Sequence, residues 1–214
     1  MRPISSDQYQ QLRSAAQVIE ADGHGDKVLL LADGSYLKLF RRKRLLSSAL
    51  LWPYARRFAD NARKLAQLGI PTLEVIALYR LREPARHLVH YRPLPGVTLR
   101  QVRRESLPCP ALLFEQLGGF VARLHQQGVY FRSIHLGNIV LTPDQQLGLI
   151  DLADLKTHGR ALGSALRLRN FRHMLRDAGD RQWLLGEAHG SFAQGYRRES
   201  TALSAEHIQQ HLRG

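Results

Sequence analysis

The pattern of apolar and polar positions over the first forty residues predicts a β-hairpin. Apolar residues fill 27–32 and 35–40, and the turn dipeptide Asp33-Gly34 separates the two runs. A D-G dipeptide between two apolar runs is a specific hairpin signal. The preceding residues, 6–19, fit either a short helix or an irregular strand.

One helix and two further strands follow the hairpin. Residues 45–68 have apolar side chains at helical spacing, with a break near Pro53, and the Gly-Ile-Pro sequence at 69–71 ends the helix. Apolar runs at 74–79 and 87–91 predict two strands joined by a polar turn. The apolar face of the helix consists of Phe58, Ala62, Leu65 and Leu68.

Prolines and a glycine at 93–96 interrupt regular structure and suit a linker between two lobes. Beyond this linker the pattern is mostly helical, with one short hairpin. The predicted helices are 111–127, 161–178 and 180–196, and the predicted strands are 138–141 and 147–151. Strands first and helices afterwards indicate an α+β fold, with a β-rich N-terminal lobe at 1–92 and a helical C-terminal lobe at 93–214.

The charge balance indicates an anionic partner. The chain has 214 residues, with 31 Lys and Arg against 18 Asp and Glu, for a formal charge of +13. Nucleic acid, a phosphorylated glycolipid and an acidic membrane face would all suit such a charge, and so would a simple solvated surface. No nucleic-acid recognition motif or aromatic platform is evident, so nucleic acid is the least favoured partner.

The cysteine content and the terminal pattern favour the cytoplasm. Cys109 is the only cysteine, so an internal disulfide is excluded. The first residues lack the apolar segment of a signal peptide, and no run approaches the roughly 20 apolar residues that span a bilayer. We therefore expect any membrane contact to be peripheral and on the cytoplasmic face.

The segment from Gly128 to Lys156 contains the strongest candidate chemistry. A loop ends at Asn138, a short hairpin follows, and Asp151 comes directly after it. This layout resembles the metal-binding half of a protein-kinase-like active site, in which an Asn and an Asp hold Mg²⁺ against ATP phosphates. Taken singly, Asn138 could cap a turn and Asp151 could cap a helix.

The residue at the catalytic-base position is unusual. The kinase catalytic loop has an Asp five residues before the Asn, and Ser133 occupies that position here. A serine cannot accept a proton at neutral pH without a partner base. His135 and Asp154 are the candidates for that partner, although His135 is also suited to packing within the loop.

Lys38 is the candidate ligand for nucleotide phosphates. It lies in the strand YLKLF, and strand alternation places it on one face with Tyr36 and Phe40. In the kinase pattern a Glu on the next helix orients this lysine. The equivalent position here is Asn61, with Asp60 as the alternative, and an Asn would pair with the lysine more weakly than a Glu.

Two segments of the N-terminal lobe allow a functional and a structural interpretation. Gly23 and Gly25 precede the lysine strand and would let backbone amides approach a phosphate, or they form a plain turn. The basic run 41–44 precedes a Leu- and Trp-containing stripe at 45–52, which suits docking on an acidic lipid surface. The same leucines could equally belong to the core of the lobe.

Taken together, these motifs resemble one enzyme group, the bacterial lipopolysaccharide core kinases that phosphorylate Kdo or heptose, and particularly their shorter "toluene tolerance" relatives. The resemblance covers roughly residues 20–180 and is strongest at 128–156. The Arg- and Asn-containing segment 167–176 is similar to the helix that follows the metal Asp in that family. The other matching features are Lys38, Gly69-Ile70-Pro71, Leu94-Pro95-Gly96, Asn138 and Asp151.

The resemblance implies an Mg-ATP-dependent kinase with a cleft between two lobes. Its implied acceptor is an anionic glycolipid or a phosphorylated core oligosaccharide. The family has His and Asp where this chain has Phe131 and Ser133, and its helix Glu is replaced by Asn61. These departures leave two functions open: a kinase with a substituted base, or a pseudokinase that acts as a binding or regulatory scaffold in cell-envelope assembly.

Overall fold

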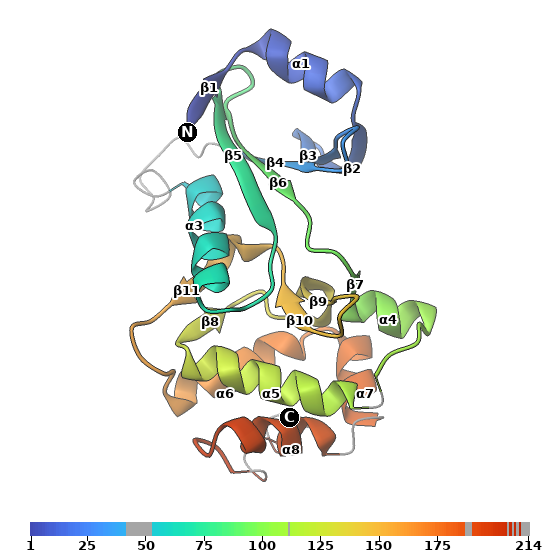
Figure 1. The fold of residues 1–214 in the computed structure, drawn as a ribbon, viewed down its shortest axis with the longest axis vertical. Coiled ribbons are helices and arrows are strands. Elements are labelled where there is room, and N and C mark those ends of the chain that lie inside the picture. The colour runs from blue at the N-terminus through green and yellow to red at the C-terminus, as the bar shows by residue number, and fades with distance from the viewer. Residues whose placement is uncertain are drawn as a thin grey trace. The chain divides into compact units, whose positions relative to one another are not determined.

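The computed structural model describes residues 1–41, 53–110, 112–186, 190–204, 206, 208 and 210. The chain divides into two compact units, Met1–Leu94 and Pro95–Gly214, each with buried residues of its own (Figure 1). The sequence pattern placed the corresponding boundary between residues 92 and 93.

The N-terminal unit is built on a six-stranded sheet. Its strands are β1 (Arg2–Ile4), β2 (Gln17–Asp22), β3 (Gly25–Leu30), β4 (Tyr36–Arg41), β5 (Glu74–Leu81) and β6 (Arg86–Arg92). The strand order is β1-β5-β6-β4-β3-β2. Only β1 is parallel to its neighbour, and the β3–β4 and β5–β6 pairs are the two hairpins that the sequence predicts.

One face of β4 packs into a core next to α1 (Ser6–Ser14). Leu37 and Leu39 are buried in a cluster with Tyr9 of α1, which shows that the N-terminal segment is a helix before it becomes β2. The same cluster contains Leu29, Leu81 and Leu88. Because side chains alternate along a strand, Lys38 lies on the opposite face of β4.

The main helix of this unit is α3 (Tyr54–Gln67). Pro53 is its N-cap, and the helix ends before Gly69, whose φ of 69° suits glycine. The predicted helix is thus confirmed from residue 54 onward, and its predicted first part at 45–52 lies outside the described residues. Its buried side chains are Ala55, Phe58, Ala59, Ala62 and Leu65.

The C-terminal unit is mostly helical. Its helices are α4 (Leu99–Glu105), α5 (Leu113–Gln126), α6 (Ser164–Met174), α7 (Ala178–Gly186) and α8 (Ser191–Glu199). The prediction of one helix over 180–196 is wrong. Gly190 has a left-handed φ of 89° and is the N-cap of α8, so the helical pattern is divided between α7 and α8. The sequence pattern also missed α4, which begins with a capping box between Thr98 and Gln101.

The middle of this unit consists of short strands and two single 3-10 turns. The strands are β7 (Val97–Thr98), β8 (Val129–Phe131), β9 (Ile139–Leu141), β10 (Leu147–Leu149) and β11 (Leu155–Thr157). The turns are η1 (Leu136–Asn138) and η2 (Leu152–Asp154). The β9–β10 pair is the predicted hairpin, and β8 pairs with β11 in a separate antiparallel ladder.

Helices α5 and α8 run side by side and touch through their backbones (Figure 1). A Cβ atom on Gly118 of α5 would lie 2.0 Å from the carbonyl oxygen of Phe192 on α8. The contact is reciprocal, because a Cβ atom on Gly195 of α8 would lie 1.9 Å from the carbonyl oxygen of Glu115 on α5. Glycine is therefore required at both positions for the helices to approach this closely.

A buried polar network joins α5, α6 and α8. The two ring nitrogens of His125 lie 2.8 Å from Tyr196 Oη and 3.2 Å from Asn170 Oδ1. Arg167, which is also buried, donates to Tyr196 Oη over 2.8 Å and to Ser200 Oγ over 2.9 Å. Buried polar groups are stable only when they are hydrogen-bonded, so these contacts couple the packing of the three helices.

His125 should make the protein sensitive to acid. Burial lowers the pKa of His125 to about 3, from the ordinary value near 6.5. Between these two pH values the unfolded chain binds one more proton than the folded chain, so the free energy of unfolding falls as the pH falls. The expected slope is up to about 1.4 kcal/mol per pH unit. Urea denaturation of the wild type and of His125→Gln between pH 7.5 and 5 measures it. A shallower slope is expected in the variant, and equal slopes would contradict this assignment.

The class and order of the elements confirm the predicted α+β fold. The N-terminal unit is β-rich, with its main helix between β4 and β5, and the C-terminal unit is mostly helical. The helix after the lysine strand and the β9–β10 hairpin are placed as in a protein-kinase-like chain.

Within the part of the chain that the structure describes, no helix combines the length and the apolar character needed to cross a membrane.

Candidate active site

Asn138 is held at the end of η1 by two hydrogen bonds. The side chain is buried, and its Nδ2 donates to the carbonyl oxygen of Ser133 over 3.0 Å. The carbonyl oxygen of Asn138 accepts from the backbone N–H of Ile150 over 3.1 Å, which ties the start of β9 to the end of β10. Because the amide nitrogen braces the loop, the side-chain oxygen remains as the acceptor that a cation would use.

Asp151 follows this hairpin in a left-handed backbone conformation, with φ 56° and ψ 54°. Asp and Asn adopt this conformation more readily than other non-glycine residues. Asp151 is the N-cap residue of η2, but its side chain makes no capping hydrogen bond, unlike a typical helix-capping aspartate. The carboxylate is exposed, and its charge acts on the nearby His135 ring.

The donor set of Asn138 and Asp151 fits Mg²⁺. An amide oxygen and a carboxylate are hard ligands, and Mg²⁺ is commonly held by one or two protein ligands together with substrate phosphates. Both residues adjoin His135, which lies 3.4 Å from the Asn138 amide nitrogen. No group of three or more His, Cys, Asp or Glu side chains that could hold a metal ion occurs among the described residues.

Ser133 donates a hydrogen bond to Asp154. The Ser133 Oγ atom lies 2.6 Å from Asp154 Oδ2, and Asp154 Oδ1 is buried without a hydrogen-bond partner among the described residues. The contact follows from the β8–β11 ladder, which pairs Phe131 with Leu155. Asp154 therefore lies beside the loop position at which the kinase pattern has its base.

The surroundings of His135 disfavour protonation of its ring. Burial lowers the pKa of His135, the positive charge of Arg100 lowers it further, and the charges of Asp180 and Asp151 oppose this effect. The ring is therefore neutral at neutral pH and is a weaker base than an ordinary histidine. Its Nδ1 atom is buried without a hydrogen-bond partner among the described residues, and its Nε2 faces Asn138.

Two residues that the motif analysis did not assign contact the start of the loop that contains Ser133. Asn170 of α6 donates from Nδ2 to the carbonyl oxygen of Phe131 over 2.7 Å, at the end of β8. His125 of α5 contacts the other end of the same amide. The similarity of segment 167–176 to the family helix was the one sequence signal for Asn170, and His125 had none.

A cluster of ion pairs lies on the α4 side of the loop. Arg100 forms a bidentate ion pair with the buried Asp180 of α7, and Arg103 lies 3.2 Å from the same carboxylate. Both arginines also approach Asp177, at 4.0 and 3.7 Å. The Arg100 guanidinium is close to Gly137, so this ion-pair cluster packs against the loop that contains His135 and Asn138.

In the N-terminal unit, Lys38 lies on the face of β4 that also has Phe40. Its Nζ atom is 5.8 Å from the ring centre of Phe58 on α3 and 6.0 Å from that of Phe40. Aromatic faces at this distance attract a cation, so the lysine is held on the α3 side of the sheet. Its role toward phosphates stays a prediction.

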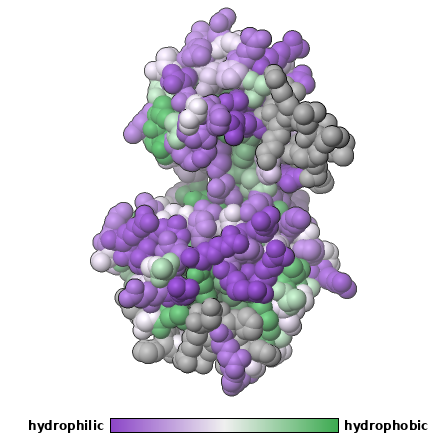
Figure 2. Space-filling model, turned by 180° about the vertical axis from the view of Figure 1, so that it is seen from behind, coloured by the Kyte–Doolittle hydropathy of each residue, from purple (hydrophilic) through white to green (hydrophobic). Residues whose placement is uncertain are grey.

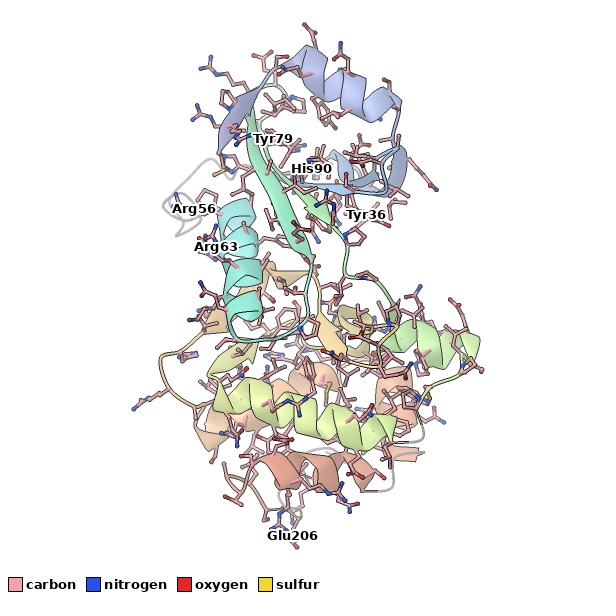
Figure 3. All side chains as sticks on the ribbon, viewed as in Figure 1. Tyr36, Arg56, Arg63, Tyr79, His90 and Glu206 are labelled. Carbon is pink, nitrogen blue, oxygen red and sulfur yellow. The ribbon has the colours of Figure 1, made fainter. Side chains whose placement is uncertain are left out.

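The two α3 candidates for orienting Lys38 differ in their surroundings. Asp60 forms ion pairs along its own helix, with Arg63 at 3.1 Å and Arg56 at 3.8 Å. Figure 3 shows these two arginines on the exposed side of α3. Asn61 is half-buried. Asn61 therefore stays the predicted partner of Lys38.

Gly23 lies in the turn between β2 and β3, and Gly25 is the first residue of β3. The backbone N–H of His24 donates to Asp22 Oδ1 over 2.8 Å, an ordinary arrangement for a tight turn. No atom lies within 4 Å of the Cβ position at either glycine, so both sites are sterically open. The turn could admit a phosphate, but none of its contacts points to one.

Two other predicted surface features have limited structural counterparts. Arg41 is exposed at the end of β4, while the rest of the basic run and the Leu- and Trp-containing stripe, 42–52, lie outside the described residues. A groove of about 490 Å³ lies between α3 and β5, away from Lys38 and the β2–β3 turn. Its lining includes Ala62, Arg63 and Ile76.

The two units have the α+β organisation of a kinase-like fold, with a β-rich N-terminal unit and a mostly helical C-terminal unit. No family model matches the sequence, and no curated protein matches it. Among solved structures, the chain is similar to WbdD in co-crystal with the kinase inhibitor LY294002, at 14% identity and a TM-score of 0.46, over 86% of this chain and 44% of that one. It is also similar to a medium-resolution structure of WbdD, a bifunctional kinase-methyltransferase, at 16% identity and a TM-score of 0.40, over 63% and 29% of the two chains. The chain thus spans less than half the length of these proteins.

Proposed function

We propose that this protein is an Mg²⁺- and ATP-dependent kinase that phosphorylates a hydroxyl group of a lipopolysaccharide core sugar. The observation that supports it most is the hydrogen bond from Ser133 to Asp154. Through this bond a carboxylate stands beside the loop position where the usual base is missing, close to the pair of residues suited to Mg²⁺. The altered loop therefore still contains a group that can receive a proton.

In the proposed reaction the proton moves through Ser133. The acceptor hydroxyl donates to Ser133 Oγ, and Ser133 passes its own proton to Asp154 Oδ2. Bound Mg-ATP supplies the γ-phosphoryl group and neutralises its charge. Because phosphoryl transfer depends mainly on positioning and charge neutralisation, a relayed proton is sufficient. His135 is a positioning residue in this scheme, since its Nε2 faces Asn138 while Ser133 is bonded to Asp154.

The nucleotide-binding roles in the N-terminal unit keep their sequence-based assignment. Lys38 contacts the phosphates, Asn61 orients Lys38, and the amides around Gly23 and Gly25 approach the phosphates. The position of Lys38 on the α3 face of β4 supports this assignment.

The proposed acceptor is anionic. The formal charge of +13 suits a phosphorylated core oligosaccharide or an anionic glycolipid. Figure 2 shows a largely hydrophilic surface on the visible face of the C-terminal unit. We place the protein in the cytoplasm, with peripheral contact at the inner membrane where a glycolipid acceptor would be reached.

Removing the charge of Asp151 should abolish metal-dependent nucleotide binding. A ligand present at about 100 times its Kd stabilises the native state by about 2.7 kcal/mol, which is readily seen in a thermal melt. We expect ATP to raise the Tm of the wild type only when Mg²⁺ is present, and the Mg²⁺-dependent part to vanish in Asp151→Asn. Asn is chosen because it also adopts the left-handed backbone. Asp144→Asn, on the same hairpin, is the matched control and should behave as wild type.

Turnover of ATP with a core oligosaccharide acceptor separates the two kinase-fold functions. Transfer that is lost in Asp151→Asn supports the kinase. Mg-ATP binding without transfer favours the pseudokinase, more firmly if Ser133→Asp combined with Asp154→Ser restores transfer. Absence of Mg²⁺-dependent binding in the wild type contradicts the proposed function.

A further inference from the structure

Three arginines surround one buried histidine beside the Ser133–Asp154 pair. Arg132 follows β8 and directly precedes Ser133, while His173 of α6 is bonded to Tyr130 of β8, with 3.1 Å between its Nε2 and the phenol oxygen. Arg169 lies four residues before His173 and Arg176 three residues after it. Arg169 therefore lies one helical turn before His173 on the same face of α6, and Arg176 lies two residues beyond Met174, the last residue of the helix.

The charges of the three arginines act on the His173 ring. Burial lowers the pKa of His173, and the charges of Arg176, Arg169 and Arg132 lower it further, in that order. Asp154 is the one carboxylate that acts in the opposite direction. The ring is thus neutral at neutral pH and lies within range of three positive charges and one negative charge.

The three arginines have no counter-ions within the part of the chain that the structure describes. Arg132, Arg169 and Arg176 are exposed, and within the described ranges none of them forms an ion pair or a hydrogen bond. Other arginines of the unit are paired with carboxylates, namely Arg100, Arg103, Arg123 and Arg198. Three like charges around one ring repel one another unless an anion binds between them.

His173 also has an unused polar atom. The side chain is 6% exposed, and its Nδ1 has no hydrogen-bond partner among the described residues, while Nε2 is engaged by Tyr130. When the Tyr130 hydroxyl donates to Nε2, the neutral ring has its proton on Nδ1 and can donate one hydrogen bond. A buried donor without a partner costs free energy, which a bound acceptor would recover.

We propose that Arg132, Arg169 and Arg176, with His173 Nδ1, form a binding site for a phosphate group on the acceptor, beside the hydroxyl that Ser133 and Asp154 activate. The site deepens the proposed function and rests on it for the identity of the ligand. The acceptor class is then a sugar that already has one phosphomonoester near the hydroxyl to be phosphorylated.

A phosphate fits this site better than a carboxylate or a neutral sugar. Guanidinium groups bind phosphate oxygens in a fixed planar geometry, and a dianion offsets several positive charges at once. The negative charge of Asp154 opposes the binding of an anion. Three positive charges are therefore needed to leave the site with a net positive charge. Asp177, the neighbour of Arg176, is already occupied by Arg100 and Arg103 and does not neutralise the site.

Binding of phosphate can be measured without ATP, Mg²⁺ or transfer. The full chain is titrated with inorganic phosphate and, separately, with glucose 6-phosphate at constant ionic strength, and the ring signal of His173 is followed by NMR. His173→Gln assigns the signal. Because an anion favours the charged ring, both ligands should raise the pKa of His173. Each of Arg132→Gln, Arg169→Gln and Arg176→Gln should weaken phosphate binding by about tenfold, since each removes a charge-assisted hydrogen bond.

Arg172→Gln is the matched control. Arg172 is exposed on the same helix, and it directly precedes His173, so it lies on a different face of α6. It should change phosphate affinity less than twofold. An equal loss of phosphate affinity in Arg172→Gln would show that binding depends on diffuse surface charge, and it would overturn the site. A His173 ring signal that changes with neither ligand would also overturn the site. Tighter binding of glucose 6-phosphate than of inorganic phosphate supports a sugar-borne phosphate, and binding of inorganic phosphate alone overturns the assignment to the acceptor.

The outcome is separable from that of the proposed function. Asp151→Asn should keep phosphate binding at His173, because it removes no part of this site. The three arginine variants should keep Mg²⁺-dependent stabilisation by ATP. A wild type that binds Mg-ATP but not phosphate rejects the anion site alone, and a wild type that binds phosphate but not Mg-ATP rejects the kinase alone.

Discussion

Gly118→Ala should strongly lower the free energy of unfolding of this protein. The added Cβ would lie 2.0 Å from the carbonyl oxygen of Phe192 and 2.8 Å from the backbone nitrogen of Tyr196. Both are backbone atoms of α8, so relief requires α5 and α8 to move apart. Overpacking typically costs 1–3 kcal/mol and occasionally more, and we expect about 3 kcal/mol here. At this chain length that corresponds to a fall in Tm of about 10 °C.

The adjacent glycine provides a control on the same helix. A Cβ on Gly119 would have the Glu199 Cγ atom as its nearest neighbour, at 3.3 Å, and this is the flexible end of a side chain. Alanine also forms helices better than glycine by about 1 kcal/mol. Gly119→Ala should therefore be neutral or stabilising in urea and thermal denaturation. Similar losses in Gly118→Ala and Gly119→Ala would contradict the close backbone contact between α5 and α8.

Asp154→Asn should have the largest effect on phosphoryl transfer after removal of the metal ligands. The amide keeps the shape of the carboxylate and can still accept the hydrogen bond from Ser133, but it cannot take up a proton. Loss of general base catalysis lowers rates by about 10²–10⁴-fold. We therefore expect kcat to fall by that factor while the KM for ATP changes little, as measured in steady-state assays with a core oligosaccharide acceptor.

Variants of Ser133 test whether the proton passes through its hydroxyl. In the relay, Ser133→Ala should lose nearly as much activity as Asp154→Asn. Ser133→Asp alone would put two carboxylates side by side, which raises the pKa of one of them and limits recovery. Exchanging the residues, with Ser133→Asp and Asp154→Ser together, should recover more activity than either change alone. A kcat for Asp154→Asn within twofold of wild type would remove Asp154 from the mechanism.

Local pattern was enough to predict three hairpins and the helices α3, α5 and α6. The D-G turn at 33–34 predicted the β3–β4 hairpin, and the apolar spacing of Phe58, Ala62 and Leu65 predicted the buried face of α3. These features depend on residues close in sequence, for which alternation and helical periodicity carry the information. The single helix predicted over 180–196 failed because periodicity continues past Gly190, while the left-handed backbone at that glycine ends regular helix.

For the candidate site, sequence spacing identified the segment and its candidate residues but not the contacts between them. It selected Asn138, Asp151 and Ser133 and left His135 and Asp154 as alternatives for the base. The difference between those two is set by the tertiary environment. Burial and the charge of Arg100 depress the pKa of His135, whereas the pairing of β8 with β11 brings Asp154 to Ser133.

The sequence by itself determined the main hairpins and helices and the side chains that have suitable chemistry. Only the tertiary structure decided which distant residues meet. The approach of Gly118 to Phe192 and the hydrogen bond between Tyr130 and His173 bring together residues far apart in the chain. Such contacts depend on how whole elements pack, and no local periodicity encodes that packing.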